Sequence, residues 1–317
     1  MLRGGADATV TLDLWAITCH FNPAGYRRRP RNYELFRARL ARQGVQVVTV
    51  ECTFGDEPPT LPPAPDVSHV RARDVLWQKE RLLNLALRAV PRWVPKVAWL
   101  DADVLLEDGW AEETSALLER APVAQPFARA VRLPPGAEED DGSSTERYAS
   151  FCHEVARDPG LLHQGSYDPH GHTGFAWAAR RELLDACGLY EGCVAGSADH
   201  VMAHAFAGGL DSACVARIFG GNSAHEGHFR AWAARVAAAA GGRGVACGSG
   251  TLLHLWHGAL RHRSYLERNR ELAALRFDPA RDLVDTAGAP LAFSLARPEL
   301  RAWASEYFRR RREDDPP

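Results

Sequence analysis

Apolar residues along the first part of the chain alternate between short continuous runs and stripes with helical spacing. The runs at 9–19, 45–51 and 96–100 are rich in β-branched and aromatic residues, and they predict strands. Between them, residues 31–42 and 75–90 place their apolar side chains on one face of a helix. Because strands and helices alternate, we expect an α/β fold with a Rossmann-like, mostly parallel central sheet flanked by helices.

The rest of the chain continues this pattern with shorter elements. We predict helices at 108–120, 264–275 and 298–312, strands at 123–127, 175–178 and 244–255, and loops at 57–66 and 134–146. The first loop is Pro-rich, and the second is acidic, polar and expected to be mobile. No internal repeat or linker is found, so one continuous domain over residues 1–317 is expected.

Composition and charge narrow the class of protein. The 317 residues are 46% hydrophobic, which is enough for a large core, and the formal net charge is −2. A net charge this close to zero does not indicate binding to nucleic acid or to an anionic membrane. Seven cysteines without a CxxC pair disfavour a disulfide scaffold and a four-cysteine zinc site. Without a secretory pattern or an apolar run of about 18 residues, we expect a soluble, cytoplasmic protein.

Two carboxylates follow the strand expected at 96–100. Asp101 and Asp103 stand just past its carboxyl end, which is the edge where open α/β sheets bind ligands. A divalent cation held by such hard oxygen ligands can act as a Lewis acid for a diphosphate leaving group. The alternative is that one aspartate caps a helix and the other faces solvent, because Asp-x-Asp is short and common.

Two histidines lie at the end of the last expected strand and just after it. His254 and His257 are three residues apart on either side of Trp256, and Gly258 comes next. One of them could complete a carboxylate metal site, and imidazole suits Mn²⁺ and Zn²⁺ better than Mg²⁺. The alternative is that both histidines are structural.

Asp199 lies at the expected start of a helix. It is either an N-cap or a general base that takes the proton of an acceptor hydroxyl.

Residues 174–184 place a glycine and aromatic side chains on a strand that leads into another helix. Such a strand can line a sugar pocket, and the alternative is ordinary core packing of Trp177.

Taken in order, these motifs resemble those of nucleotide-diphospho-sugar glycosyltransferases with the GT-A fold, nearest to the family-2-like and galactosyltransferase-like groups. The resemblance covers roughly residues 12–275, with Asp-x-Asp after an apolar strand, Gly-Phe-x-Trp-x-x-Arg-Arg-Glu, Gly-x-x-Asp and His-x-x-His-Gly. It implies a hexosyltransferase-like enzyme that uses a nucleotide-diphospho-sugar, with a UDP-sugar as the expected donor, and a divalent metal (Mn²⁺ or Mg²⁺). It also implies a donor half at about 9–130, an acceptor half at about 145–275, and a C-terminal helical extension at 276–317.

The resemblance further assigns roles to single residues. Asp103 would ligate the metal, and Asp101 would lie near the metal or the ribose. His257 or His254 would be a third ligand, and Asp199 would be the catalytic base of an inverting reaction. The candidate donor contacts are Thr18, Asn22, Glu51, Lys79 and Arg81, and the candidate acceptor contacts are Gly174, Trp177 and Glu182. For Lys79 and Arg81, the alternative is an ion-paired surface helix.

Other classes of protein fit the sequence less well. His200 and His204 have the i, i+4 spacing of helical zinc sites in hydrolases, but Val201 stands where the zincin pattern needs Glu. A dinucleotide-binding dehydrogenase is disfavoured because residues 20–25 are not a Gly-rich loop. A non-catalytic sugar-nucleotide-binding protein would be expected to lose a metal carboxylate or the base, and this chain keeps both.

The motifs leave the acceptor open among small molecules, glycans, proteins and hydroxymethylpyrimidine bases of phage DNA. Arginines cluster at 27–31, 261–270 and 309–312, and such patches could hold a phosphate backbone. The alternative is that these arginines lie on solvated helix faces. A DNA acceptor predicts salt-sensitive binding, and a small acceptor does not.

Overall fold

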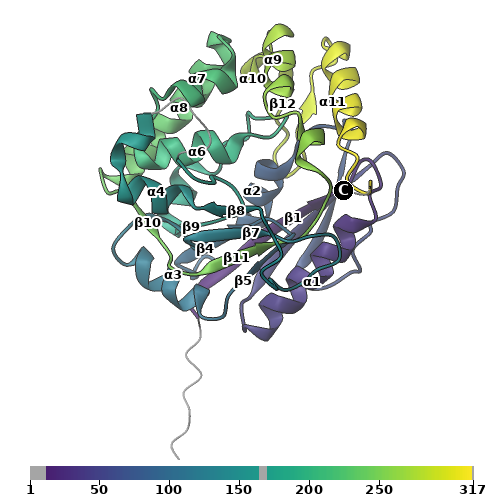
Figure 1. Cartoon of the computed structure of the whole chain (residues 1–317). Coiled ribbons are helices and arrows are strands. Elements are labelled where there is room, and N and C mark those ends of the chain that lie inside the picture. Colours follow the sequence, from purple (N-terminus) through teal and green to yellow (C-terminus); the bar gives the residue numbers. More distant parts are fainter. Residues whose placement is uncertain (1–11, 164–169, 316–317) are drawn as a thin grey trace, which may run out of the picture.

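The computed structural model describes residues 12–163 and 170–315, and its centre is a seven-stranded sheet with the order β10-β6-β9-β4-β1-β2-β3 (Figure 1). The strands are β1 (Leu14–Phe21), β2 (Val47–Phe54), β3 (Val67–Ala72), β4 (Lys96–Leu100), β6 (Val123–Gln125), β9 (Ala176–Arg180) and β10 (Val245–Cys247). Neighbouring strands are parallel except at β9, which is antiparallel to β4 and β6. The predicted mostly parallel α/β sheet is thereby confirmed, and strands from both halves of the chain share it.

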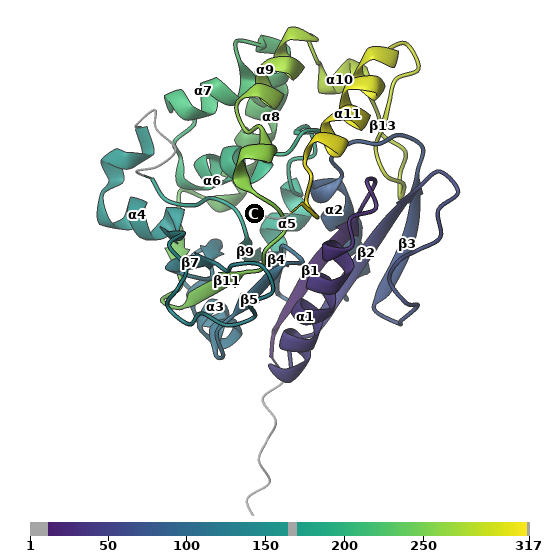
Figure 2. The same ribbon diagram turned by 45° about the vertical axis from the view of Figure 1, so that its right-hand side comes forward.

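Helices cover both faces of this sheet (Figures 1 and 2). One face carries α1 (Arg28–Arg42) and α3 (Trp110–Leu118), and the other carries α2 (Lys79–Ala89), α5 (Arg181–Cys187), α6 (Ala198–Ala207) and α8 (Ser223–Ala240). Along β4, Val97 and Trp99 enter the core on the α2 side, while Ala98 and Leu100 enter the core on the α1 side. Both faces of β4 are buried, which is why this strand has a continuous apolar run instead of an alternating pattern.

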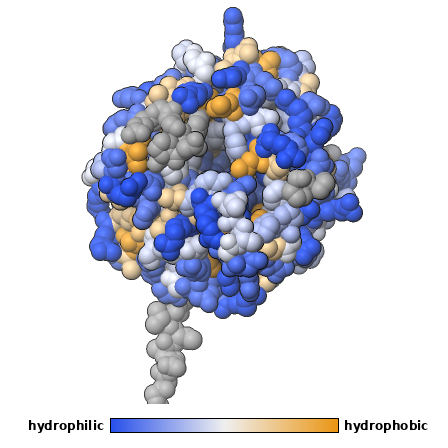
Figure 3. Space-filling view, in the orientation of Figure 1, coloured by the Kyte–Doolittle hydropathy of each residue, from blue (hydrophilic) through white to orange (hydrophobic). Residues whose placement is uncertain are grey.

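Shorter elements complete the molecule. A four-stranded sheet has the order β5-β11-β7-β8, from β5 (Val104–Leu106), β11 (Thr251–His254), β7 (Arg129–Arg132) and β8 (Arg147–Ala149). The remaining helices are α4 (Phe151–Arg157), α7 (Ala213–Phe219), α9 (Glu267–Ala274), α10 (Pro279–Asp282) and α11 (Pro298–Arg310), and β12 (Leu283–Val284) pairs with β13 (Ala292–Phe293). The face seen in Figure 3 is mostly hydrophilic, with small scattered apolar groups. No helix within residues 12–163 or 170–315 combines the length and apolar character needed to cross a membrane.

Most predicted elements are present, with three corrections. The strand expected at 244–255 is two strands in different sheets, because the chain turns at Gly248, where a Cβ would lie 2.7 Å from the carbonyl carbon of Pro126. The helix expected from residue 75 begins only at Lys79. Strand β3 was not predicted, because it is a mostly polar edge strand without an apolar run. Residues 9–11 of the first expected strand lie outside the described residues.

Candidate active site

A cavity of about 860 Å³ opens at the carboxyl ends of the parallel strands. Asp101 and Asp103, which directly follow β4, line this cavity together with His254 at the end of β11. Asp199, in the first turn of α6, and Gly174, just before β9, line it from the second half of the chain. Residues that are far apart in the sequence therefore meet at the sheet edge where the sequence predicted a site.

Asp103, His254 and His257 form a group that can hold a metal ion. Their ligand atoms lie within 4.8 Å of one another. Nε2 of His257 is 3.4 Å from Asp103 Oδ2, Nε2 of His254 is 3.7 Å from Asp103 Oδ1, and the two Nε2 atoms are 2.9 Å apart. Oδ1 of Asp103 is buried and accepts no hydrogen bond from any described residue. A buried, unpaired carboxylate oxygen facing two imidazoles fits a divalent cation.

Burial sets the protonation of this group. It raises the pKa of the Asp103 carboxyl to about 7, and the negative Asp101 nearby adds to the increase. Burial also lowers the pKa values of His254 and His257 well below the ordinary value, so both imidazoles are neutral at neutral pH. Neutral imidazoles are the form that binds metal, and a bound cation would favour the ionised Asp103.

The C-terminal tail reaches this group through Glu313, which is fully buried. Its carboxylate accepts hydrogen bonds from Arg29 at 2.6 and 2.8 Å and from Arg311 at 2.7 Å, and it lies 3.4 Å from Arg263. Burial alone would raise the pKa of Glu313, but these guanidinium groups outweigh it and hold that pKa well below the ordinary value. Nδ1 of His257 lies 2.6 Å from the guanidinium of Arg263 and 3.9 Å from Glu313. The tail therefore supports the ring of His257.

Lys79, the first residue of α2, joins the two carboxylates on the other side of the cavity. Its Nζ lies 2.6 Å from Asp101 Oδ1 and donates to Asp199 Oδ2 at 2.8 Å. Burial works to lower the pKa of Lys79, but the two carboxylates outweigh it and raise that pKa well above the ordinary value. Burial raises the pKa of Asp199, and Lys79 opposes this. Asp199 is thus an ion-pair partner, and no side chain caps α6.

Two residues at the cavity adopt left-handed backbone conformations. Phe175 has φ 80° and Ser197 has φ 77°, which costs a residue with a Cβ about 1–2 kcal/mol. The carbonyl of Phe175 accepts from the backbone N–H of Asp101 at 2.8 Å, and Ser197 Oγ accepts from Arg268 at 2.8 Å. Such strain is found at functional sites. Here it fixes Asp101 and the start of α6.

Several residues predicted to contact the donor lie outside the cavity. Thr18 is fully buried, and its hydroxyl donates to a carbonyl of β4 at 2.8 Å. The carboxylate of Glu51 accepts from the backbone N–H groups of residues 60 and 61 at 2.7 and 3.0 Å, which fixes the loop after β2. Arg81 is buried in salt bridges with Glu191 and Asp285. These three side chains therefore have partners within the fold and do not line the cavity.

The other predicted contact residues that lie outside the cavity also have local surroundings that explain their positions. Both polar atoms of the Asn22 side chain bond to the backbone of Tyr26 and close a turn. Trp177 is 1% exposed and stacks on Trp99 in the core, which was the alternative interpretation. Glu182 points to solvent, with a 77% exposed side chain. Gly174 alone among the expected acceptor contacts lines the cavity, where its Cβ position faces Asp199.

Comparisons with known proteins find matches among solved structures. No family model matches the sequence, and neither does any curated protein. The structure is similar to the catalytic domain of Drosophila beta-1,4-galactosyltransferase 7, solved in complex with xylobiose, with a TM-score of 0.40 and 13% identity over 92% of this chain and 98% of that one. It is also similar to a putative glucose-1-phosphate thymidylyltransferase from Bacillus anthracis, with a TM-score of 0.35 and 8% identity over 87% and 98%. These similarities are too low to indicate what this chain binds.

Proposed function

We propose that this protein is a metal-dependent glycosyltransferase that moves a sugar from a nucleotide-diphospho-sugar, with a UDP-sugar as donor, to a hydroxyl group. One observation supports this most strongly. Asp101, Asp103, His254, His257 and Asp199 come from three separate segments, yet all of them line a single cavity. That set combines metal ligands with a carboxylate that can accept a proton, which is what glycosyl transfer from a diphosphate requires.

The charge of the cavity fits an anionic donor. Its basic lining residues include Arg29, Lys79, Arg132, Arg263, Arg268 and Arg311. Guanidinium groups recognise phosphate oxygens with paired hydrogen bonds. A diphosphate would place its negative charge among these groups, next to the metal candidates, at the edge of the sheet where α/β proteins bind nucleotides.

The expected metal has a matching ligand set. Asp103, His254 and His257 would hold it, with Asp101 beside them, and their mixed carboxylate and imidazole donors suit Mn²⁺. When bound, the cation would stabilise the charge that develops on the leaving diphosphate. Glu313 and Arg263 keep His257 oriented, and Lys79 keeps Asp101 in place.

Asp199 is the residue we assign as general base. It faces the cavity beside Gly174, and Lys79 holds its Oδ2 oxygen. Accepting the proton of an acceptor hydroxyl would let that oxygen attack the anomeric carbon from the side opposite the diphosphate, which inverts the configuration. Tyr148 and Tyr265 line the same cavity and offer aromatic faces for sugar rings, in place of the buried Trp177.

The proposal is tested by thermal shift with UDP-, GDP-, CMP- and dTDP-sugars, each with and without Mn²⁺. A ligand that binds the folded state raises the melting temperature by mass action. We expect a rise with UDP-sugars that appears only with Mn²⁺, and release of UDP when an acceptor is supplied. A metal-dependent shift without turnover of any acceptor would instead favour a non-catalytic sugar-nucleotide-binding protein.

We expect a small or glycan acceptor that fits this cavity. Among the arginines that suggested DNA, Arg263, Arg268 and Arg311 are buried, with 4% or less exposed, so they face the cavity and not an outer surface. Arg29 is paired with Glu313. Hydroxymethylated duplex DNA remains the alternative acceptor. Its binding would weaken steeply with salt, because phosphate contacts release counterions.

A further inference from the structure

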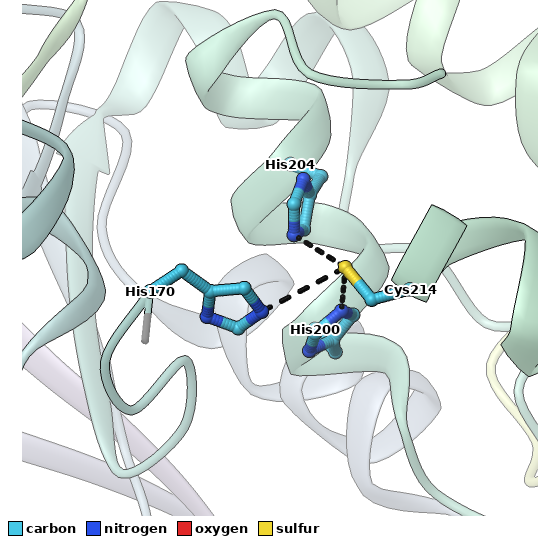
Figure 4. Close-up of side chains that lie close together, drawn as sticks. All are labelled: His170, His200, His204 and Cys214. Atoms are coloured by element: carbon cyan, nitrogen blue, oxygen red, sulfur yellow. Dashed lines mark hydrogen bonds between the residues drawn. The ribbon is translucent and has the colours of Figure 1, made fainter. Parts of the chain in front are cut away.

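A second group of potential metal ligands, which does not include Asp103, lies beside α6 (Figure 4). His200 and His204 stand one turn apart on α6, Cys214 lies in the first turn of α7, and His170 belongs to the segment before β9. All four side chains are buried, with at most 5% exposed. Three separate segments of the chain therefore bring four potential ligand atoms to the same buried point. Two come from α6, one from α7 and one from the segment before β9.

The imidazoles converge on a single sulfur atom. Nε2 of His200 lies 3.1 Å from Cys214 Sγ, Nε2 of His204 lies 3.3 Å from it, and Nε2 of His170 lies 3.7 Å from it. Figure 4 shows the three rings pointing toward this sulfur from different sides. The four ligand atoms lie within 4.8 Å of one another.

Backbone carbonyl groups orient two of the three rings. Nδ1 of His204 is 3.1 Å from the carbonyl oxygen of Gly209, and Nδ1 of His170 is 3.0 Å from that of Gly171. A carbonyl oxygen only accepts, so these two Nδ1 atoms carry the ring protons and the Nε2 atoms present lone pairs. Both of these lone pairs face Cys214 Sγ, and a cation at the centre could be bound by them and by the sulfur.

We propose that His170, His200, His204 and Cys214 bind a structural zinc ion. In a tetrahedral zinc site with Zn–S and Zn–N bonds of ordinary length, neighbouring sulfur and nitrogen ligands stand about 3.6 Å apart. The observed separations of 3.1 to 3.7 Å bracket that value. Four protein ligands leave no open position, which is the arrangement of structural sites. A thiolate among imidazoles selects zinc over the hard cations that carboxylates prefer.

The surroundings of the four ligands fit this assignment. The carbonyls of Gly209 and Gly171 orient two of the rings, in the way that outer hydrogen bonds orient zinc-bound histidines. Ser212 Oγ lies 3.0 Å from Cys214 Sγ and can donate to a thiolate. Burial lowers the pKa of His204 to about 4, with His170 contributing, so this ring is in its neutral, ligating form at neutral pH.

This site would act on the cavity by position. His200 directly follows Asp199 in α6. The segment that begins at His170 leads into Gly174, where a Cβ would lie 3.4 Å from Oδ2 of Asp199. A zinc ion that joins α6, α7 and this segment would fix the direction in which Asp199 points. The zinc site itself does not depend on the proposed glycosyltransferase activity.

The test measures bound metal in the full-length chain, purified without chelator and then dialysed to remove weakly held ions. We expect one zinc per chain by mass spectrometry of the metal content. After exchange with Co²⁺, we expect the near-ultraviolet absorption of a thiolate–cobalt bond. Of the two candidate metal groups among the described residues, only the one with Cys214 contains sulfur. The double variant Asp103→Ala/His257→Ala should therefore keep both signals.

Cys214→Ala should lose the zinc and the cobalt–thiolate absorption, and its melting temperature should fall. Cys152→Ala is the matched control, because Cys152 is also a buried free thiol, and it should keep both signals. A folded wild-type protein that takes up zinc but gives no thiolate–cobalt absorption would overturn the proposal. So would absorption that survives in Cys214→Ala. If Cys214→Ala does not fold, the wild-type measurement can still overturn the proposal, because a zinc-loaded protein without thiolate–cobalt absorption has no cysteine ligand.

Discussion

The ammonium group of Lys79 donates a hydrogen bond to Oδ2 of Asp199 over 2.8 Å, which links the first turn of α2 to the first turn of α6. The same ammonium lies 2.6 Å from Asp101. One cation therefore holds both the carboxylate beside the metal candidates and the proposed base. An incoming diphosphate would compete for this cation, and any weakening of the bond to Asp199 would free that carboxylate to accept a proton.

Replacing Lys79 with Met should destabilise the protein. It leaves Asp101 and Asp199 without their shared cation, and removing one partner of a buried ion pair costs about 3 kcal/mol. The free energy of unfolding in urea measures this loss. Arg157→Met is the control, because Arg157 pairs with Glu154 at an exposed position and such pairs contribute less than about 1 kcal/mol. Adding Asp199→Asn to Lys79→Met should restore part of the loss, and a further loss would contradict the shared-cation interpretation.

Asp199→Asn should abolish turnover but leave binding of the donor unchanged. An amide cannot take a proton from the acceptor, and a positioned base contributes about 10²–10⁴-fold to the rate. The melting-temperature rise with UDP-sugar and Mn²⁺ should persist, because Asp199 is not among the metal candidates. Comparison of kcat with the thermal shift separates the two roles. Undiminished kcat in this variant would remove Asp199 as the base.

Asp103→Asn should weaken metal binding by at least about tenfold. The substitution keeps the size of the side chain but removes the charge that faces His254 and His257. Titration of free Mn²⁺, followed by electron paramagnetic resonance, measures the affinity directly. Asp141→Asn, in the exposed loop between β7 and β8, is the control and should bind Mn²⁺ as the wild type does. Unchanged affinity in Asp103→Asn would place the metal elsewhere.

The sequence placed Asp101 and Asp103 at the edge of the sheet where the candidate site lies. Asp101 and Asp103 could be found because β4 is a fully buried apolar strand, so the residues after it had to emerge at the ligand-binding edge. His254 is the last residue of β11, and His257 follows that strand by three residues. In both cases a local pattern, a strand followed by polar residues, carried the information.

Contacts that depend on tertiary packing could not be read in this way. Lys79 and Arg81 were equal candidates, but residues two apart in a helix point in nearly opposite directions, and α2 turns only Lys79 toward the cavity. Glu313 was missed because an acid in an Arg-rich tail is the pattern of a solvated helix end. The His200 and His204 pair was visible, but its partners His170 and Cys214 are set by how α7 and the segment before β9 pack.

Glu80 should make stability depend on pH. Burial raises the pKa of this carboxyl from an ordinary 4.5 to about 8, with Lys79 opposing the shift and Asp199 adding to it. Between about pH 4.5 and pH 8 the folded chain therefore holds a proton that the unfolded chain has lost. Because the folded state binds more protons in this window, the free energy of unfolding should fall as the pH rises through it.

Glu80→Gln removes this titration, so its melting temperature should change less than that of the wild type between about pH 5 and pH 8. The variant should be the more stable protein at the upper end of the range. Glu112→Gln, at an exposed position of α3, is the control and should follow the wild-type curve. Parallel curves for wild type and Glu80→Gln would show that Glu80 is ionised in the folded protein.

Glu313→Gln should damage both stability and metal binding, although residue 313 lies far from the other site residues in sequence. The buried carboxylate is surrounded by Arg29, Arg263 and Arg311, so removing its charge leaves three guanidinium groups in mutual repulsion, at a cost of about 3 kcal/mol. Arg263 would then hold the ring of His257 less firmly, and the affinity of the site for Mn²⁺ should fall as a result.

Asp315→Asn, two residues further along the tail and exposed, tests whether the effect belongs to that contact or to tail charge in general. If both variants lowered stability and Mn²⁺ affinity equally, the buried contact of Glu313 would not be the cause.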